Sequence, residues 1–357
     1  MYRTFLIKFF VFALAIATLF GSFVFVVDPL QFYRQASFYP PMYSGEQRFQ
    51  NAGLAKNFEY DRIILGTSMT ENFVPSYVDE VMGGKTMKLS KSGSTAHEHY
   101  LAANLAFDTG QVDEVIWGMD YASFRTGAEG VREDQGGFPA YLYDQNLLTD
   151  FKYLLNFSVI QDARDIMLEE FGLKEERHIR NLDMLNNWDY FSTYGNEHVW
   201  NHYEASLPAE RTTALNEPEL EIAYEAFDAN LLKMIEENPD TTFYLFYPPY
   251  SILRQHLWYE ENRNRYDNQQ AFKEYVFEKV GHLDHVEIYD FQAIEDIVLD
   301  LDSFKDLSHH TQEINDYMIE SFATGEHQMT EDNYVEMIHS LTDILEELDI
   351  ETLPRDE

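Results

Sequence analysis

Ser68 is the residue of this chain best placed for nucleophilic chemistry. It ends the tripeptide Gly66-Thr67-Ser68, directly after the apolar run 62–65, which is typical of a buried parallel strand at its carboxyl end. A serine at a strand-to-helix turn exposes its hydroxyl, and the backbone N–H groups of the turn can meet an oxyanion. The same tripeptide is also typical of a helix N-cap, so Ser68 alone leaves both interpretations open.

Near the other end of the chain, an aspartate and a histidine supply the base that a serine nucleophile needs. Asp306 and His309 form a D-x-x-H pattern just before a helix that we predict to begin near Thr311. On a tight loop, the Asp306 carboxylate accepts the Nδ1–H of His309 while Nε2 faces a serine hydroxyl. Without the serine, the pair is equally typical of a turn carboxylate and a surface histidine beside His310.

Two residues between these motifs fall where oxyanion donors are required. Gly93 follows the second predicted strand, and its missing side chain lets its N–H approach a bound carbonyl oxygen. Asp120 follows the third predicted strand, in the sequence Trp-Gly-Met-Asp-Tyr. Taken separately, Gly93 also fits a plain turn and Asp120 a plain helix cap.

The order of Ser68, Gly93, Asp120 and the Asp306-x-x-His309 pair resembles the motif blocks of the SGNH, or GDSL-like, hydrolase superfamily. The resemblance implies a Ser68-His309-Asp306 catalytic triad and an oxyanion hole at Ser68, Gly93 and the third block. That third block normally reads G-x-N-D, with the asparagine as a donor. Here Asp120 stands in its place, and an ionised carboxylate would repel an oxyanion.

The layout of the chain is similar to that of membrane-anchored, extracytoplasmic members of this superfamily, the DltD-like and alginate-acetylation (AlgJ/AlgX-like) proteins. Such a likeness implies an esterase or acyltransferase that acts on O-acyl groups of a cell-envelope or exported polysaccharide or a teichoic acid, beside a membrane-bound O-acyltransferase. The alternative is a non-catalytic SGNH-like scaffold or binding protein that assists such an acyltransferase. Asp120 in place of asparagine favours that alternative.

Strand and helix patterns alternate around these residues, which predicts an α/β fold with a mainly parallel five-stranded sheet. The resemblance implies a three-layer α/β/α, flavodoxin-like arrangement of it. The expected strands are Arg62–Leu65, Thr86–Leu89, Glu114–Gly118, Thr242–Tyr247 and Val286–Phe291, with a helix over Ala96–Phe107.

Three further stretches flank or interrupt this alternation. Residues 121–210 interrupt the alternation and predict an insertion of helix and loops around one helix, Val159–Phe171. The aromatic side chains of this insertion either face the functional edge of the sheet or form the insertion's own core. Asn216 with Glu219 predicts a capping-box start for the next helix. The expected segments are an anchor over 1–28, an extended connection over 29–60, the SGNH-like domain over 61–323 and an acidic terminal helix within 324–357. The aromatic side chains of the insertion are Phe138, Tyr141, Tyr143, Trp188, Tyr190 and Trp200.

The first residues predict a membrane anchor. The run from Phe9 to Val27 is uncharged and close to the roughly 20 residues that span a bilayer core. Arg3 and Lys8 precede it and Asp28 follows it, so the positive-inside rule places the N-terminus in the cytoplasm and the catalytic domain outside the cell membrane. A cleaved signal peptide is the alternative, although no small-x-small cleavage site precedes Asp28.

Composition excludes several classes of function. The 357 residues carry 63 Asp and Glu against 25 Lys and Arg, and such an acidic surface repels nucleic acid. There is no cysteine, so disulfides, thiolate metal sites and a cysteine nucleophile are excluded. His97 and His99 point to different faces of a helix, and no third ligand has suitable spacing, so we expect no metal and no cofactor. The sequence Tyr247–Ser251 predicts a rigid turn in preference to a substrate contact.

Overall fold

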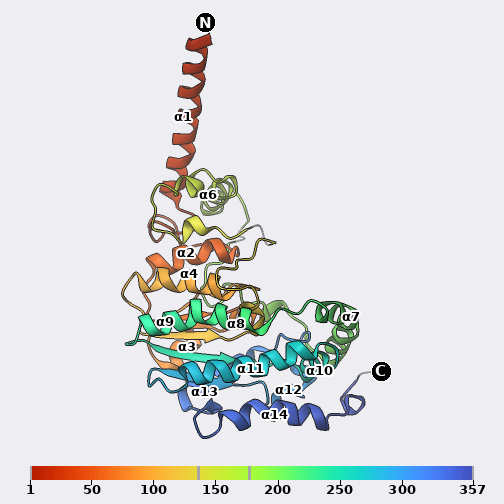
Figure 1. Ribbon diagram of the computed structural model, residues 1–357. Coiled ribbons are helices and arrows are strands. Elements are labelled where there is room, and N and C mark those ends of the chain that lie inside the picture. The colour runs from red at the N-terminus through yellow and green to blue at the C-terminus, as the bar shows by residue number, and fades with distance from the viewer. Residues whose placement is uncertain (1, 135–136, 176–177, 356–357) are drawn as a thin grey trace.

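A six-stranded sheet in the order β2-β1-β3-β4-β5-β6 forms the centre of the molecule (Figure 1). The computed structural model describes residues 2–134, 137–175 and 178–355. Five strands are parallel and β6 is antiparallel to β5, so the sheet is mixed and has one strand more than predicted. The five predicted strands are all confirmed. The sixth, β6, was not predicted, because a strand of two residues is too short to show an alternation of apolar and polar side chains. The strands are β1 Arg62–Leu65, β2 Thr86–Lys88, β3 Glu114–Gly118, β4 Thr242–Tyr247, β5 Val286–Asp290 and β6 Gln328–Met329.

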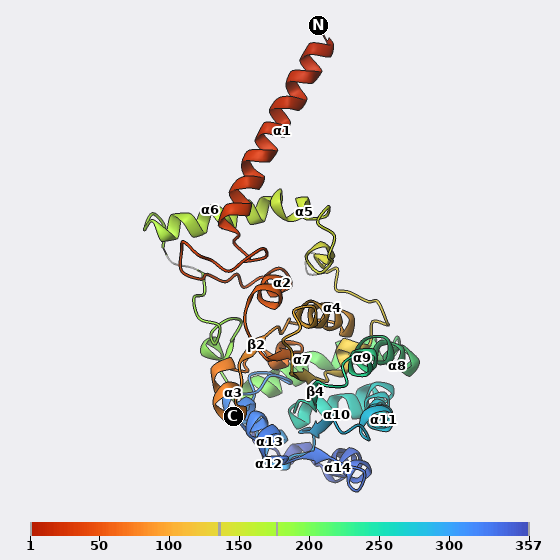
Figure 2. The same cartoon turned by 90° about the vertical axis from the view of Figure 1, so that its left-hand side faces the viewer.

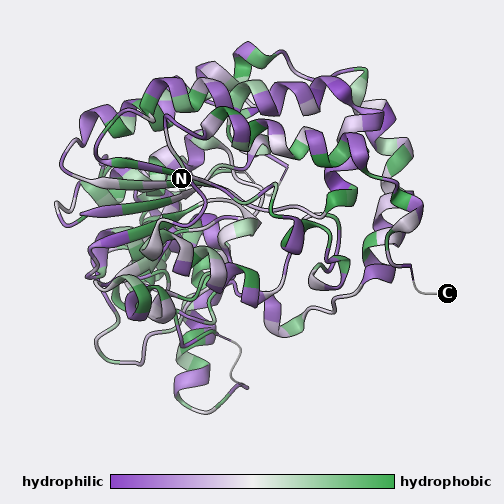
Figure 3. Cartoon of the chain, turned by 90° about the horizontal axis from the view of Figure 1, so that it is seen from below, coloured by the Kyte–Doolittle hydropathy of each residue, from purple (hydrophilic) through white to green (hydrophobic). Residues whose placement is uncertain are grey.

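Successive side chains of each central strand pack against different helices, because side chains alternate between the two faces of a sheet. In β1, Ile63 and Leu65 belong to the core cluster shared with α4 and α11, whereas Ile64 packs with α3 and α13. Helices accordingly lie on both sides of the sheet (Figure 3). Burial on both faces explains why β1 reads as a continuous apolar run. The helices of these two layers are α3 Pro75–Met82, α4 Ala96–Phe107, α8 Leu220–Phe227, α9 Lys233–Glu237, α11 Arg263–Val280 and α13 Gln312–Thr324.

The N-terminal helix α1, Tyr2–Val27, projects from the rest of the molecule (Figures 1 and 2). It is long and apolar enough to cross a membrane, and only 11% of its most apolar stretch is buried against the rest of the protein. Its last residues behave differently, since Val24 and Val27 are buried in the folded part. By length and composition, α1 fits either a signal anchor or a signal sequence.

The expected extended connection is wrong for its second half, because Gln47–Asn57 forms helix α2, which packs against α4. The side chains that α2 buries include Gln50 and Asn51, so the helix shows no apolar stripe in the sequence. Their polar atoms are satisfied: the Asn51 amide donates to the carbonyls of Leu89 and Ser90 at 2.8 and 3.0 Å. This helix therefore supports the end of β2.

The insertion contains more helix than predicted. Its expected helix is confirmed as α6, Phe157–Glu170, and a short α5, Phe151–Leu154, precedes it. The 19-residue α7, Asn196–Ala214, was not predicted; it packs against α10, Ile252–Glu261. A proline at position 208 and few buried residues conceal α7 in the sequence.

The C-terminal half mostly follows expectation. The capping box is wrong, because α8 begins at Leu220 and Glu219, rather than Asn216, is its N-cap, with no side-chain cap hydrogen bond. A π-helical turn, Asp228–Leu232, joins α8 to α9. The remaining helices are α12, Glu295–Val298, and the terminal α14, Tyr334–Glu347, which confirms the predicted acidic helix.

Substitution of Gly53 tests how closely α2 packs. A Cβ added there would lie 1.9 Å from the Leu30 carbonyl oxygen, so backbone must move. Gly to Ala inside a helix is normally stabilising by up to about 1 kcal/mol, but we expect Gly53→Ala to destabilise the fold by about 1 to 3 kcal/mol. Chemical denaturation of the detergent-solubilised chain measures this. Gly45→Ala is the control, since its nearest contact is an ordinary 3.9 Å; equal stability of the two variants would contradict the packing.

Candidate active site

The turn after β1 presents the Ser68 hydroxyl rather than using it as a cap. Thr67 is the N-cap of the short 3₁₀ helix Ser68–Thr70, and its Oγ1 accepts the Met69 N–H at 3.4 Å. The helix-cap interpretation of the tripeptide is therefore confirmed, but the cap is Thr67 and not Ser68. Gly66 is required because a Cβ there would lie 2.5 Å from a methyl carbon of Thr70.

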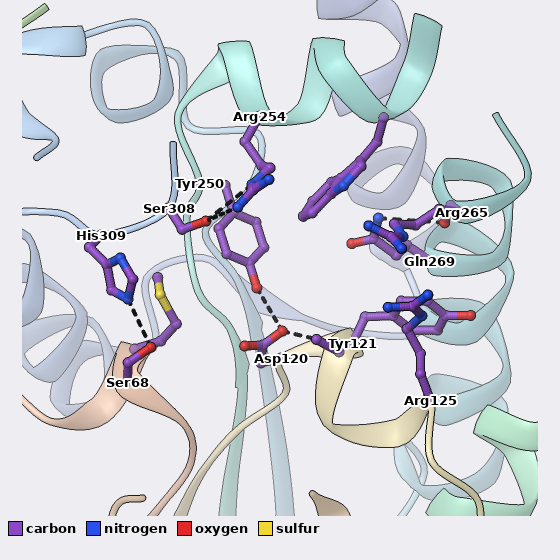
Figure 4. Close-up of a pocket in the computed structure, with 13 residues that line it drawn as sticks. Ser68, Asp120, Tyr121, Arg125, Tyr250, Arg254, Arg265, Gln269, Ser308 and His309 are labelled. Atoms are coloured by element: carbon purple, nitrogen blue, oxygen red, sulfur yellow. Dashed lines mark hydrogen bonds between the residues drawn. The ribbon is translucent and has the colours of Figure 1, made fainter. Parts of the chain in front are cut away.

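Ser68, His309 and Asp306 form a continuous chain of hydrogen bonds. His309 Nε2 lies 2.8 Å from Ser68 Oγ (Figure 4), and His309 Nδ1 lies 2.8 and 3.0 Å from the two carboxylate oxygens of Asp306. The structure thus brings together three residues from opposite ends of the chain. Such contacts suit a serine nucleophile with an oriented histidine base.

The Asp306 carboxylate is held in its charged form. Burial alone would raise its pKa, but the hydrogen bond and charge of His309 and the backbone N–H groups of Ser308 and His309 together lower the pKa well below its usual value. Those two N–H groups donate to Oδ1 at 2.8 and 3.0 Å. An ionised Asp306 therefore persists through the neutral range and favours a proton on Nδ1 of His309.

Trp188 of the insertion closes one side of the triad. Its ring meets the His309 ring edge to face at 5.1 Å, and its Nε1 donates to the Ser68 carbonyl at 3.3 Å. The Lys305 ammonium lies 3.5 Å from the centre of the Trp188 ring. The insertion therefore does reach the functional edge of the sheet, through Trp188 at the triad and through Tyr121 and Arg125 in the cavity beside Ser68.

The other aromatic side chains named from the insertion do not touch the triad. Tyr143 is buried and packs on Phe138 at 4.7 Å, and Trp200 belongs to the core between α7 and α10. Tyr141 packs against the main core, and Tyr190 is exposed. For most of these residues, the core interpretation is the correct one.

Two of the three expected oxyanion positions, Ser68 and Gly93, offer a backbone N–H group to a ligand. The N–H groups of Ser68 and Gly93 donate no hydrogen bond within the described part of the chain, so both are free to meet a ligand. The loop of Gly93 lies beside the nucleophile turn, because the Lys91 N–H donates to the Gly66 carbonyl at 3.0 Å. Gly93 itself does not line the cavity next to Ser68, and it adopts a left-handed φ of 55° that favours glycine.

Asp120 acts as an acceptor, not as the donor that its position in the third block would supply. Its Oδ2 accepts the Thr67 hydroxyl at 3.0 Å, and its Oδ1 accepts the Tyr250 hydroxyl at 2.9 Å and the Ala122 N–H at 3.1 Å. All three of these donors are satisfied by the carboxylate oxygens.

A cavity of about 150 Å³ adjoins the triad, with Ser68 and His309 at one end. Three guanidinium groups, those of Arg125, Arg254 and Arg265, line the rest together with aromatic side chains (Figure 4). These arginines were not predicted, because each comes from a segment without a motif: Arg254 lies on α10, Arg265 on α11, and Arg125 directly after the short 3₁₀ helix Tyr121–Phe124.

Tyr250 is a site residue that the sequence placed in a structural role. The sequence Tyr247–Ser251 does turn the chain after β4, but Tyr250 also lines the cavity and bonds to Asp120. Its position just after a parallel strand was the signal that could have identified it, since ligands bind at the carboxyl ends of such strands.

The two histidines of the His97–His99 pair have structural partners. His97 Nδ1 lies 2.9 Å from the Asn230 side-chain oxygen, and His99 is buried against Ser94. Among the residues that the structure describes, there is no group of three His, Asp or Glu that could hold a metal ion.

The tautomer of His309 tests this geometry. In the neutral ring we expect the proton on Nδ1, directed at Asp306, with Nε2 accepting from Ser68. Nitrogen-detected NMR of the histidine side chains, with the signal assigned by its loss in His309→Gln, measures it. Asp306→Asn should shift the population toward Nε2–H, whereas Asp343→Asn on the exposed face of α14 should not. A wild-type ring protonated at Nε2 would contradict the hydrogen-bond chain.

Comparison of the sequence with models of known protein families gives no match, and comparison with curated proteins gives no significant similarity. The function must therefore be argued from the side chains gathered at the carboxyl edge of the sheet.

Proposed function

We propose that this chain is a membrane-anchored, extracytoplasmic serine acyl-transfer enzyme of the SGNH type, an esterase or O-acyltransferase. The single observation that carries the proposal is the hydrogen-bond chain Ser68–His309–Asp306, with each contact at 2.8 to 3.0 Å. The position of Ser68 after β1 and of the D-x-x-H loop before α13 agrees with the motif order of that superfamily.

In the proposed reaction, Ser68 Oγ attacks the carbonyl carbon of an ester while His309 Nε2 takes the hydroxyl proton. The N–H groups of Ser68 and Gly93 stabilise the oxyanion, and Asp306 stabilises the imidazolium. As the intermediate collapses, the ester C–O bond breaks and His309 returns the proton to the leaving alcohol. Water or an acceptor hydroxyl then attacks the acyl-serine by the reverse sequence, which gives hydrolysis or transfer respectively.

The fold supports this assignment. Helices on both faces of a mainly parallel sheet correspond to the three-layer, flavodoxin-like arrangement of SGNH domains, and the added antiparallel β6 lies at the edge away from β1. The insertion and α14 are additions around that arrangement.

The end of α1 supports an uncleaved anchor over a signal peptide. Val24 and Val27 are buried, and the Asp28 carboxylate accepts the N–H groups of Phe32, Tyr33 and Arg34 at 2.8 to 3.0 Å. Cleavage before Asp28 would remove buried side chains from the folded part. With Arg3 and Lys8 at the cytoplasmic end, the catalytic domain lies outside the cell membrane.

The substrate class follows from the anchor. A domain fixed near the bilayer can receive an acyl group from a membrane-bound O-acyltransferase before it is hydrolysed, which favours transfer to a nearby hydroxyl. Trp188 beside the triad offers a ring face and edge of the kind on which sugars stack. We therefore propose O-acyl groups of an envelope or exported polysaccharide, or of a teichoic acid, as the substrate.

A non-catalytic scaffold that assists an acyltransferase is the second candidate. Asp120 favours it, because a carboxylate beside Ser68 replaces a neutral oxyanion donor. The two candidates differ in whether Ser68 is chemically reactive.

Labelling with a fluorophosphonate separates the two. We expect covalent modification of Ser68 in the wild-type chain and none in Ser68→Ala, and a loss of ester turnover of roughly 10⁴- to 10⁶-fold in Ser68→Ala and His309→Gln. Ser340→Ala on α14 is the matched control and should label normally. In cells, Ser68→Ala should reproduce the ester content of a deletion strain's surface polymers. A Ser68→Ala strain with wild-type ester content would favour the scaffold.

A further inference from the structure

The cavity beside Ser68 contains one guanidinium that lacks an ionic partner. Arg125 pairs with Glu217 at 2.9 Å, and Arg265 pairs with Glu210 at 2.9 Å and with Glu217 at 2.8 Å. Arg254 has no carboxylate within ion-pair distance in the described part of the chain; its Nε and Nη2 both donate to Ser308 Oγ at 3.1 Å.

In this protein acidic residues outnumber basic ones by 63 to 25, yet within the described part of the chain none of them forms an ion pair with Arg254. Burial lowers the pKa of Arg254, yet a guanidinium stays charged at any physiological pH. Within the described part of the chain its Nη1 makes no hydrogen bond, and the side chain points to the cavity between Ser308 and Tyr250 (Figure 4). A partly buried charge with free donors fits a site whose anion arrives with a ligand.

We propose that Arg254 binds an anionic group of the substrate, a carboxylate or a phosphate, close to the ester that Ser68 attacks. This proposal rests on the proposed acyl-transfer function. A cavity of about 150 Å³ holds only a small group, so the anion lies within a few bonds of the ester carbonyl. Asp120 does not prevent this, because its oxygens are directed to Thr67 and Tyr250 and it accepts three hydrogen bonds there.

The anion could be carried by the acyl group or by the alcohol of the ester, and two pairs of test esters distinguish these sources. For an anion on the acyl group, the 4-nitrophenyl monoester of succinate is compared with its methyl ester. For an anion on the alcohol, 3-carboxyphenyl acetate is compared with 3-carbamoylphenyl acetate. The full-length protein in detergent is assayed for kcat/KM with each. A charged hydrogen bond gives roughly 10- to 100-fold preference, so we expect that preference for the anionic member of one pair.

In Arg254→Gln the preference should fall to near unity, with turnover of the neutral member changed much less. Arg263→Gln, an exposed arginine paired with Asp267 outside the cavity, should keep the wild-type ratio. Equal losses on both members would make Arg254 a positioning residue for the Ser308–His309 loop and overturn the proposal, as would a wild-type enzyme with no anionic preference. Absence of fluorophosphonate labelling at Ser68 would instead count against the catalytic function itself.

A separate observation concerns the insertion. Five large apolar side chains between positions 147 and 157 are exposed, among them Leu147 and Leu148 at 81 and 84% and Phe157 at 72%. A soluble surface rarely exposes such a cluster without a partner. The five are Leu147, Leu148, Phe151, Leu155 and Phe157, which we call the apolar rim.

The apolar rim lies beside the membrane-spanning part of α1. Helices α5 and α6 cross the base of α1 (Figure 2), and both contact it. A Cβ at Gly21 would lie 3.6 Å from Leu155 Cδ2, and a groove lined by Gly21, Phe25, Phe151 and Leu155 joins the two elements. At about 1.5 Å per residue, Gly21 lies about 9 Å along α1 from Val27.

We infer that the apolar rim inserts into the outer leaflet of the bilayer and forms a second membrane contact. The inference rests on α1 as a retained anchor. The contact at Gly21 sets Leu155 of the rim about 9 Å below the end of the apolar helix, within the 5 to 10 Å depth at which interfacial helices bury their apolar faces. Its apolar surface is continuous with that of α1, so lipid is the occupant that the position favours over a protein. Two contacts would fix the tilt of the domain and the distance of Ser68 from the membrane.

The absence of native cysteine makes the test direct. The Leu148→Cys variant is labelled at its cysteine with an environment-sensitive fluorophore and placed in lipid nanodiscs. Quenching of this fluorophore by lipids brominated at defined depths reports whether position 148 is inserted in the bilayer. We expect strong quenching at position 148 and none at Leu215→Cys, an equally exposed leucine after α7. Phe12→Cys within α1 tests the anchor: quenching at 12 without quenching at 148 overturns the rim, whereas no quenching at 12 overturns the anchor. Quenching at both positions supports the rim.

Discussion

The Asp120 carboxylate is the point at which the loops of three strands are joined. It follows β3, and it accepts hydrogen bonds from Thr67 after β1 and Tyr250 after β4. Parallel pairing of β1, β3 and β4 brings these loops to one edge, but pairing alone leaves their side chains free to move. The carboxylate fixes Thr67, Thr67 caps the turn that presents Ser68, and the position of Ser68 relative to His309 depends on that turn.

The same contacts describe how a carboxylate fits at position 120, where the resemblance in motif order leads to the expectation of an asparagine. Its three partners, two hydroxyl groups and one backbone N–H, all donate to the carboxylate oxygens. The proposed oxyanion donors are then the backbone N–H groups of Ser68 and Gly93. Charge near the reacting atoms is then shared between this carboxylate and the guanidinium groups across the cavity.

Many of the few basic residues are engaged inside the fold. Arg48 pairs with Glu98, and Lys273 pairs with Asp290 at 2.6 Å in a fully buried contact. Burial lowers the pKa of Lys91 to about 7, and its ammonium nitrogen donates to the Glu98 carbonyl beneath the loop of Gly93. Because these cations are internal, the outer surface is dominated by acidic groups, and the Arg254 guanidinium lies at the cavity without a carboxylate partner among the described residues.

Five strands, the apolar N-terminal helix and three residues of the site could be predicted from the sequence, because each is a local pattern: a short apolar run, an uncharged stretch of bilayer length, and a D-x-x-H pair before a helix. Helices α2 and α7, whose buried side chains are polar or sparse, could not, nor could the capping of α8, where the helix begins later than the local pattern suggested. Three features became visible only in the folded chain: Thr67 caps the turn, Trp188 rather than its neighbours reaches His309, and Tyr250 and Arg254 face the cavity. These outcomes depend on contacts between residues far apart in the chain, and such contacts are set by the packing of whole elements, which no local spacing encodes.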